Sequence, residues 1–246
     1  MWDRLLFKAR GKDAFRRNYG SAVAVTFIMG LINMLVSGSS SGASNANTHT
    51  QFSINEGTYY VTDGFHSSGV SLFSTMLFLF LVVVVLALTV LKIFIGYNLE
   101  VGGAKFFIQN QTSRPGVDMI LDGFRSGHYG NIVFTMFCRN LFISLWSLLF
   151  IIPGIVKYYE YMMVPYILAE NPGMDRKEVF QISKEMMNGH KTDAFFLDLS
   201  FIGWQFLSAF TCGILAIFYV NPYIQATHAE IYAFNKQKAF ESGYIR

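Results

Sequence analysis

The residues of this sequence that could carry chemistry are polar and ionisable side chains set inside long apolar segments. An ionised side chain at the centre of a bilayer costs about 3 kcal/mol or more unless it is paired or hydrated, so it marks a candidate functional position. The candidates for a ligand or ion pathway are Arg139, Asn140, Lys157, Glu160, Asp198 and Asn221.

Arg139 stands beside Asn140, about a third of the way along the apolar stretch 132–152. A guanidinium at this place can contact an anion or a lipid headgroup, or act as a gate. It can equally form a structural ion pair with Glu160 or Asp198, or extend its charged end to the inner face of the membrane. The sequence leaves these alternatives open.

The other candidates also have both structural and functional interpretations. Lys157 and Glu160 lie three residues apart, so on a helix they share a face and form either a proton or cation site or a local ion pair. Asp198 falls one turn into a later apolar stretch, where it can cap the bundle on the cytoplasmic side. Asn221-Pro222 is expected to kink the last helix, with or without a ligand on the freed backbone carbonyls.

Motifs for metal binding and catalysis are missing. The cysteines and histidines show no zinc-like spacing, and neither HExxH nor the phosphate-binding GxxxxGK[ST] occurs. His190 follows a predicted helix, where a cation is favoured beside the last carbonyls, and metal binding there is the weaker alternative. We therefore expect no enzyme, no metal, no cofactor and no nucleic-acid partner.

The composition is that of a membrane protein. Of 246 residues, 52% are hydrophobic and only 14% are charged, whereas soluble domains are about a quarter charged. The apolar residues gather in long runs, and a helix needs ~20 of them to cross a hydrocarbon core ~30 Å thick. The sequence therefore predicts an all-α, polytopic transmembrane helical bundle whose partner is the lipid bilayer.

We expect a single transmembrane domain over residues 1–246, with six spans and both termini in the cytoplasm. The predicted spans are 21–36, 70–95, 132–152, 155–169, 194–210 and 214–232. Between them we expect an outer loop at 38–69, a polar segment with short interfacial helices at 96–131, and an amphipathic cytoplasmic helix at 175–190. Residues 155–169 are few, so this stretch either tilts across the membrane or re-enters without crossing.

Charge placement tests this topology. Six crossings put every basic cluster on one face, as the positive-inside rule expects. Four crossings, with 132–168 as a re-entrant unit, are expected to place 175–191 outside and so fit less well. The basic clusters lie at 1–20, 92–125, 176–191 and 236–246, while 37–69 and 211–213 hold no Lys or Arg.

Several blocks resemble a bacterial membrane family known as domain of unknown function 975. The run from Leu145 to Lys157 reads LWSLLFIIPGIVK and is similar to the family's LWxLLxxIPGIIK signature. Glu170 stands where the family usually has an aspartate before Asn-Pro. Further similar blocks are VPYILAENP at 164–172, ISKEMMNGHK at 182–191, SFIGW at 200–204 and NPY at 221–223.

The resemblance covers about residues 96–232. It implies a multi-pass protein of the bacterial cytoplasmic membrane, from a Gram-positive organism. It brings no established activity and no catalytic residues to carry over.

Two functions remain as hypotheses. The first is a transporter-like or lipid-handling bundle, because broken helices at Pro153 and Pro222 flank polar side chains, as in carriers with a midplane site. The second is a non-catalytic scaffold, accessory or immunity protein that binds a membrane-protein partner or another copy of itself. Its docking surfaces would be the helix 175–190 and the loop 38–69.

Overall fold

The computed structural model describes residues 2–36, 68–211 and 213–241, and within these ranges all regular secondary structure is helical. The predicted loop 38–69 lies outside them apart from its last two residues, which begin a helix. The helices are α1 Arg4–Arg17, α2 Tyr19–Val36, α3 Ser68–Leu91, α4 Tyr97–Gln109, α5 Asp122–Arg125, α6 Tyr129–Leu149, α7 Ile151–Glu160, α8 Val164–Glu170, α9 Arg176–Met186, α10 Lys191–Leu199, α11 Ile202–Phe210 and α12 Asn221–Glu241, with short η1 Lys92–Gly96, η2 Val117–Leu121 and η3 Ala216–Val220.

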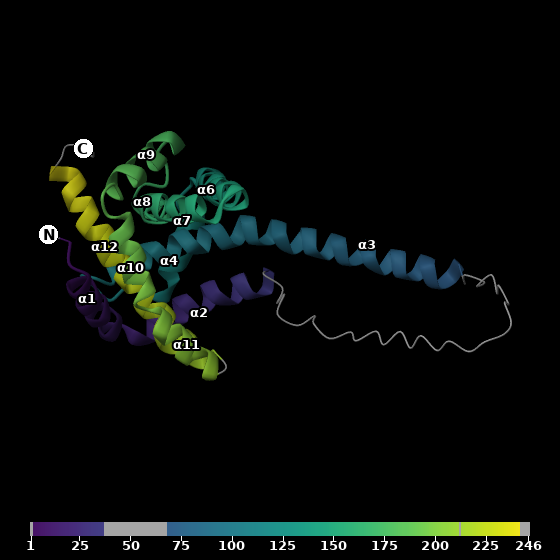
Figure 1. The fold of residues 1–246 in the computed structure, drawn as a ribbon, viewed down its shortest axis with the longest axis horizontal. Coiled ribbons are helices and arrows are strands. Elements are labelled where there is room, and N and C mark those ends of the chain that lie inside the picture. Colours follow the sequence, from purple (N-terminus) through teal and green to yellow (C-terminus); the bar gives the residue numbers. More distant parts are fainter. Residues whose placement is uncertain (1, 37–67, 212, 242–246) are drawn as a thin grey trace, which may run out of the picture.

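One end of the molecule is a packed body of short helices, from which apolar helices extend (Figure 1). The body contains α1, α4, α8, α9 and α12, and α3 runs far beyond it. Its interior is apolar and aromatic, as burial of such side chains requires. The largest fully buried side chains are Phe7, Phe15, Phe106, Phe107, Phe201, Ile132, Met136, Met163, Leu168, Met187, Leu197 and Ile231.

Helix α1 docks along α12. Its start is fixed by Asp3, whose carboxylate accepts hydrogen bonds from the Leu5 and Leu6 amides at 2.9 and 3.3 Å. Its buried face includes Gly11, and a Cβ there would lie 2.9 Å from the Thr227 backbone of α12. Only a residue without a side chain allows the two helices to approach this closely.

His190 lies where the start of the chain meets α12. Its ring stacks on Trp2 with 4.7 Å between centroids, and its Nε2 is 2.9 Å from Lys238 Nζ. Burial and the Lys238 charge lower the pKa of His190. These surroundings disfavour the cation expected at this helix end.

Helix α3 continues through η1 into α4, so that Ser74–Gln109 forms one long helical stretch. The described side chains of α3 are exposed or half-buried, whereas Phe106 and Phe107 of α4 are fully buried in the body. The prediction of short interfacial helices over the first part of 96–131 is wrong, because no proline or loop residue interrupts the helix before Asn110.

Helices α6 and α7 form an antiparallel hairpin that turns at Phe150, whose backbone is extended with φ −154° and ψ 138°. The turn therefore precedes Pro153, which sits in the first turn of α7, where its missing N–H leaves no hydrogen bond unmade. A Cβ on Gly154 would lie 2.3 Å from Ser147 Oγ. Gly154 thus allows α6 and α7 to be in contact.

The stretch 155–169 is not one helix. It is divided between α7, which ends at Glu160, and α8, whose residues from Val164 to Ala169 are all buried in the body. The stretch 194–210 is likewise divided, by a break at Ser200 between α10 and α11. A turn with Gly213 at φ 81° then leads into η3, where a positive φ favours glycine.

Two helical stretches of the described residues are long and apolar enough to cross a bilayer: Ser74–Gln109 and Tyr129–Leu149. In the first, the most apolar window has none of its residues buried inside the protein. Large apolar side chains are also exposed at the end of α6 and at the end of α11, where Leu148 and Phe210 are each 85% exposed. These features indicate association with a membrane.

Candidate functional site

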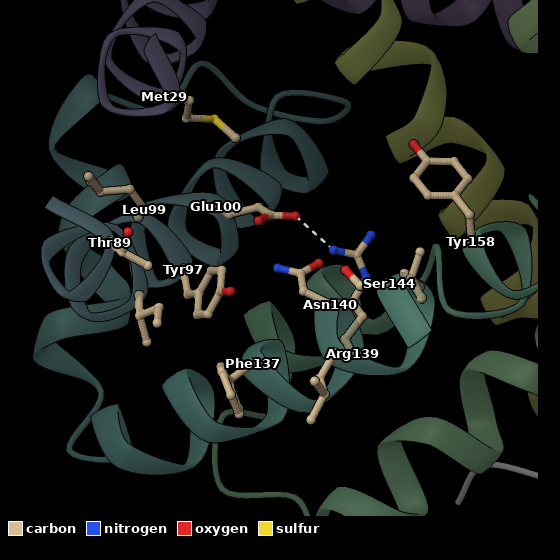
Figure 2. A pocket seen from close by; sticks show the side chains of 14 residues that line it. Met29, Thr89, Tyr97, Leu99, Glu100, Phe137, Arg139, Asn140, Ser144 and Tyr158 are labelled. Atoms are coloured by element: carbon tan, nitrogen blue, oxygen red, sulfur yellow. Dashed lines mark hydrogen bonds and ion pairs between the residues drawn. The ribbon is translucent and has the colours of Figure 1, made fainter. Parts of the chain in front are cut away.

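A cavity of about 670 Å³ lies where the long helix and the α6–α7 hairpin leave the body (Figure 2). Its walls come from α2, α3, η1, α4, α6 and α7. Apolar side chains such as Phe137 and Leu99 form part of the lining, and Arg139 lies among polar side chains (Figure 2). The polar side chains of the lining are Thr89, Tyr97, Glu100, Arg139, Asn140, Ser144 and Tyr158.

Arg139 and Glu100 form an ion pair at this cavity, drawn as the dashed line in Figure 2. Arg139 Nη1 lies 3.0 Å from Glu100 Oε1, and Arg139 Nε donates to the Tyr161 carbonyl at 3.0 Å. The Arg139 side chain is 9% exposed and that of Glu100 36%. A guanidinium carries five N–H groups, so donors of Arg139 beyond these two bonds remain for a ligand.

The π-helical turn η1 positions Glu100. A π turn widens the helix, so backbone carbonyls lose their usual partners, and such turns recur at functional sites. Here the Phe94 carbonyl accepts from the Asn98 side chain at 3.1 Å and from the Tyr129 hydroxyl at 2.7 Å. The second bond ties the long helix to the start of α6, and so fixes the helices that carry Glu100 and Arg139 relative to each other.

Arg139 is therefore not paired with either predicted carboxylate. Glu160 and Asp198 both have other partners, and Glu100 from α4 lies nearer. Asn140 lines the same cavity as Arg139, whereas Lys157, Glu160, Asp198 and Asn221 do not. The structure thus places two of the six predicted site residues, Arg139 and Asn140, at this cavity.

Glu160 lies in a separate, closed cluster. Lys157 Nζ and Lys191 Nζ each bind one of its carboxylate oxygens, at 2.8 and 2.9 Å. Ser183 Oγ donates to the Glu160 carbonyl at 2.8 Å. Of the two predicted interpretations, the geometry is that of an ion pair, extended by a second lysine from α10.

Asp198 and Asn221 also lie apart from the cavity. Asp198 accepts from the Tyr159 hydroxyl at 3.0 Å and lies 2.7 Å from His228 Nε2. Asn221 begins α12 just after the π-helical turn η3, and its amide donates to the Ala216 carbonyl. It lines a smaller cavity of about 160 Å³ between α2 and α12.

A smaller cavity of about 70 Å³, called the chamber below, adjoins the main cavity. Glu100 and Arg139 line both spaces, and Tyr158 and Met29 do so as well. The chamber reaches α12, where Gln225 and His228 contribute to its wall. The ion pair thus stands where the two spaces adjoin.

Sequence reasoning missed Glu100 and His228. Glu100 fell in a segment taken for interfacial, although the absence of Pro between 70 and 109 was the signal that one helix continues. His228 was set aside because no metal partner stands at the right spacing. Its partner Asp198 is 30 residues away and only the fold brings them together.

The C-terminal part of the chain is similar to a known protein family. Residues 141–238 match the family model described as "Protein of unknown function (DUF975)". This confirms the resemblance, over a shorter stretch than 96–232. The matched segment contains Asp198, His228 and the α7 wall of the chamber, and it begins two residues after Arg139.

No curated protein and no solved structure matches this chain. The match to the family model is therefore the comparison that bears on identity, and that model describes no activity.

Proposed function

We propose that this chain is an integral membrane protein that handles lipid, binding the anionic headgroup of a membrane lipid at Arg139. The observation that carries the proposal is a mostly buried arginine with spare donors at a large cavity, between helices whose outer surfaces are apolar. A headgroup phosphate would accept from Arg139, and the acyl chains would lie along the apolar walls.

Membrane embedding is supported by the exposed surface of α3. In a soluble protein an amphipathic helix buries its apolar face and shows its polar face to water. The described part of α3 has no polar face, since Phe78, Leu79, Phe80 and Leu81 are all more than half exposed in succession. Such a helix is stable where the surroundings are as apolar as its side chains, which is the interior of a bilayer.

The topology we propose keeps both termini in the cytoplasm of a bacterial cell, with the basic clusters on that side. Six crossings give this arrangement. A re-entrant α6–α7 hairpin gives it too, because such a hairpin returns to the side from which it entered. The charge argument against re-entry of 132–168 is therefore wrong, and the ten residues of α7, about 15 Å at 1.5 Å per residue, are too short to cross alone.

An anionic amphiphile fits the cavity better than a small polar solute. Arginine binds phosphate through directed N–H groups, and Asn140, Ser144 and Tyr97 add polar contacts around it. The apolar part of the lining, which includes Phe137, Leu141 and Ile143, would gain nothing from a small polar ligand. Glu100 faces the same space and disfavours excess negative charge, so a singly charged headgroup is the ligand we expect.

The scaffold hypothesis has less support. Its proposed docking helix, α9, turns its apolar residues into the body, where Val179, Ile182 and Met186 are buried. Asp175 caps this helix by accepting from the Lys177 amide at 3.1 Å. The apolar side of α9 is thus already occupied, and the loop 38–67 lies outside the described residues.

Native mass spectrometry of the detergent-purified chain tests the proposal. We expect phosphatidylglycerol to bind more tightly than zwitterionic phosphatidylcholine, and Arg139→Gln to weaken phosphatidylglycerol binding about tenfold or more, since a charged hydrogen bond contributes about 1.5–3 kcal/mol. Arg125→Gln is the matched control, because Arg125 is exposed on the body away from the cavity. Equal loss in both variants, or no preference for the anionic lipid, would overturn the proposal.

A further inference from the structure

The chamber holds a buried histidine that the proposed lipid site does not use. His228 of α12 is only 9% exposed, and its ring lines the chamber together with Glu100 and Arg139. A chamber of about 70 Å³ has room for water.

Asp198 fixes the orientation of this histidine. His228 Nε2 lies 2.7 Å from Asp198 Oδ1, and Asp198 Oδ2 accepts from the Tyr159 hydroxyl at 3.0 Å. With Nε2 as the donor to Asp198, Nδ1 is left to bind a proton. Among the described residues no hydrogen bond to Nδ1 is formed.

The charges around the chamber show what a proton would change. With His228 neutral, Arg139 contributes one positive charge, and Glu100 and Asp198 contribute two negative charges. Protonation of His228 brings this group to neutrality. A less negative chamber beside the Arg139 donors favours an anion in the adjoining cavity.

The groups that face His228 come from several helices. Asp198 belongs to α10, Glu100 to α4 and Arg139 to α6. The tyrosines around the chamber are Tyr158 and Tyr159 of α7 and Tyr166 of α8. From α1, Lys8 Nζ donates to Ser200 Oγ at 2.9 Å, two residues beyond Asp198. Of these groups, the neutral histidine is the side chain that gains a second ring N–H on protonation.

We propose that His228 is a proton-binding site, and that its protonation strengthens binding of the anionic headgroup at Arg139. The step adds one proton to Nδ1 and turns the imidazole into an imidazolium, while Asp198 keeps Nε2 in place. Glu100 and Arg139 transmit the change, because they line both the chamber and the cavity. This inference rests on the proposed lipid site and makes that site sensitive to pH.

The test is equilibrium binding of short-chain phosphatidylglycerol, below its critical micelle concentration, at pH values between about 5.5 and 8. Its phosphodiester stays ionised throughout this range, so the lipid itself does not titrate. Coulomb's law gives a change in affinity of about two- to fifteenfold for a unit charge at a separation of about 10 Å, depending on the effective dielectric constant. We expect tighter binding at acidic pH by a factor in this range, and a flat profile for His228→Gln.

The control variant is His128→Gln, because His128 lies outside both the cavity and the chamber and should keep the wild-type pH profile. Proton uptake on lipid binding, measured with an indicator dye in weak buffer, gives an independent readout. We expect uptake by the wild type and none by His228→Gln. If His228→Gln does not fold, Asp198→Asn must reduce the pH response and the uptake.

The outcomes separate the two proposals. No binding of the anionic lipid at any pH overturns the proposed function itself. Binding that is tight, dependent on Arg139 and equal at all pH values overturns only the role of His228. A soluble headgroup, glycerophosphoglycerol, distinguishes recognition of the headgroup alone from recognition of the whole lipid. If it binds as tightly as the lipid, the apolar walls make no contribution, and the membrane is not the required source of the ligand.

Discussion

Two ionic clusters in this protein, one around Glu160 and one around Arg139, both contain a buried charged side chain but differ in how fully that side chain is paired. Glu160 is 5% exposed in its side chain, and each of its carboxylate oxygens is bound by a lysine. Arg139 is almost as buried, but it pairs with one half-exposed carboxylate, Glu100, beside a cavity of about 670 Å³. The Glu160 carboxylate has a partner on each oxygen and therefore serves to hold helices together. The Arg139 guanidinium keeps unused N–H donors beside a cavity and can therefore bind a ligand.

The largest expected effect is the loss of stability when the closed cluster around Glu160 is broken. Glu160→Gln leaves the ammonium groups of Lys157 and Lys191 without their shared anion, so we expect a loss of about 3 kcal/mol of stability. Thermal unfolding in detergent measures it. Glu178→Gln, at an exposed position on α9, is the control and should change stability little. Equal melting temperatures for the two variants would mean that the closed cluster does not hold the helices.

The next largest effect is expected when α6 and α7, two walls of the Arg139 cavity, are forced apart. In Gly154→Ala the new Cβ meets Ser147 Oγ at 2.3 Å and Ser147 Cα at 2.7 Å, so α6 and α7 must move apart. We expect a loss of about 2 kcal/mol, as for other overpacked contacts, together with weaker binding of phosphatidylglycerol. Gly203→Ala on α11 meets nothing within 4 Å, so it should be neutral or slightly stabilising. If Gly154→Ala also leaves stability unchanged, α6 and α7 are not in contact at Gly154.

Glu100→Gln tests the open ionic cluster in the opposite direction, because this substitution should strengthen ligand binding. Removing the carboxylate frees Arg139 Nη1 and deletes a negative charge beside the ligand, so affinity for phosphatidylglycerol should rise about three- to tenfold. Stability should fall by about 1 kcal/mol, because the pair is half open to its surroundings. The same native mass spectrometry measures affinity, and a decrease would contradict the role given to Glu100.

The smallest expected effect is a pH dependence of stability that comes from His190 in the packed body. Because the pKa of His190 is lowered in the folded state by burial and by Lys238, the unfolded chain binds more protons below about pH 6.5. Stability should therefore fall as the pH decreases through this window. The difference in melting temperature between wild type and His190→Gln measures it, and should shrink on acidification. A constant difference from about pH 7 to 5 would show that His190 does not titrate differently on folding.

The helical class of the fold could be predicted from the sequence, because long apolar runs with few charges leave helices as the way to satisfy the backbone in a membrane. Helix ends were harder to place. The turn between α6 and α7 lies at Phe150, three residues before Pro153, and neither residue alone reveals that. The closeness of Gly154 to Ser147 depends on the hairpin that forms around it.

The candidate site could be predicted only in part. Arg139 and Asn140 could be found because a polar pair in an apolar run is visible in the letters. The partners could not, since Glu100 is 39 residues away from Arg139 and His228 is 30 residues away from Asp198. Such pairs are set by how the helices pack. A one-residue change in helix register, such as the π turn η1 introduces, changes which side chains meet.

The most direct test of the central claim is a structure of the chain in phosphatidylglycerol nanodiscs, at a resolution that shows lipids around Arg139. We expect headgroup density within hydrogen-bond distance of the Arg139 guanidinium, about 2.7–3.2 Å, with acyl chains against Phe137 and Leu141. A cavity without headgroup density, in which Arg139 contacts only Glu100 and the Tyr161 carbonyl, would contradict the account and make this arginine structural.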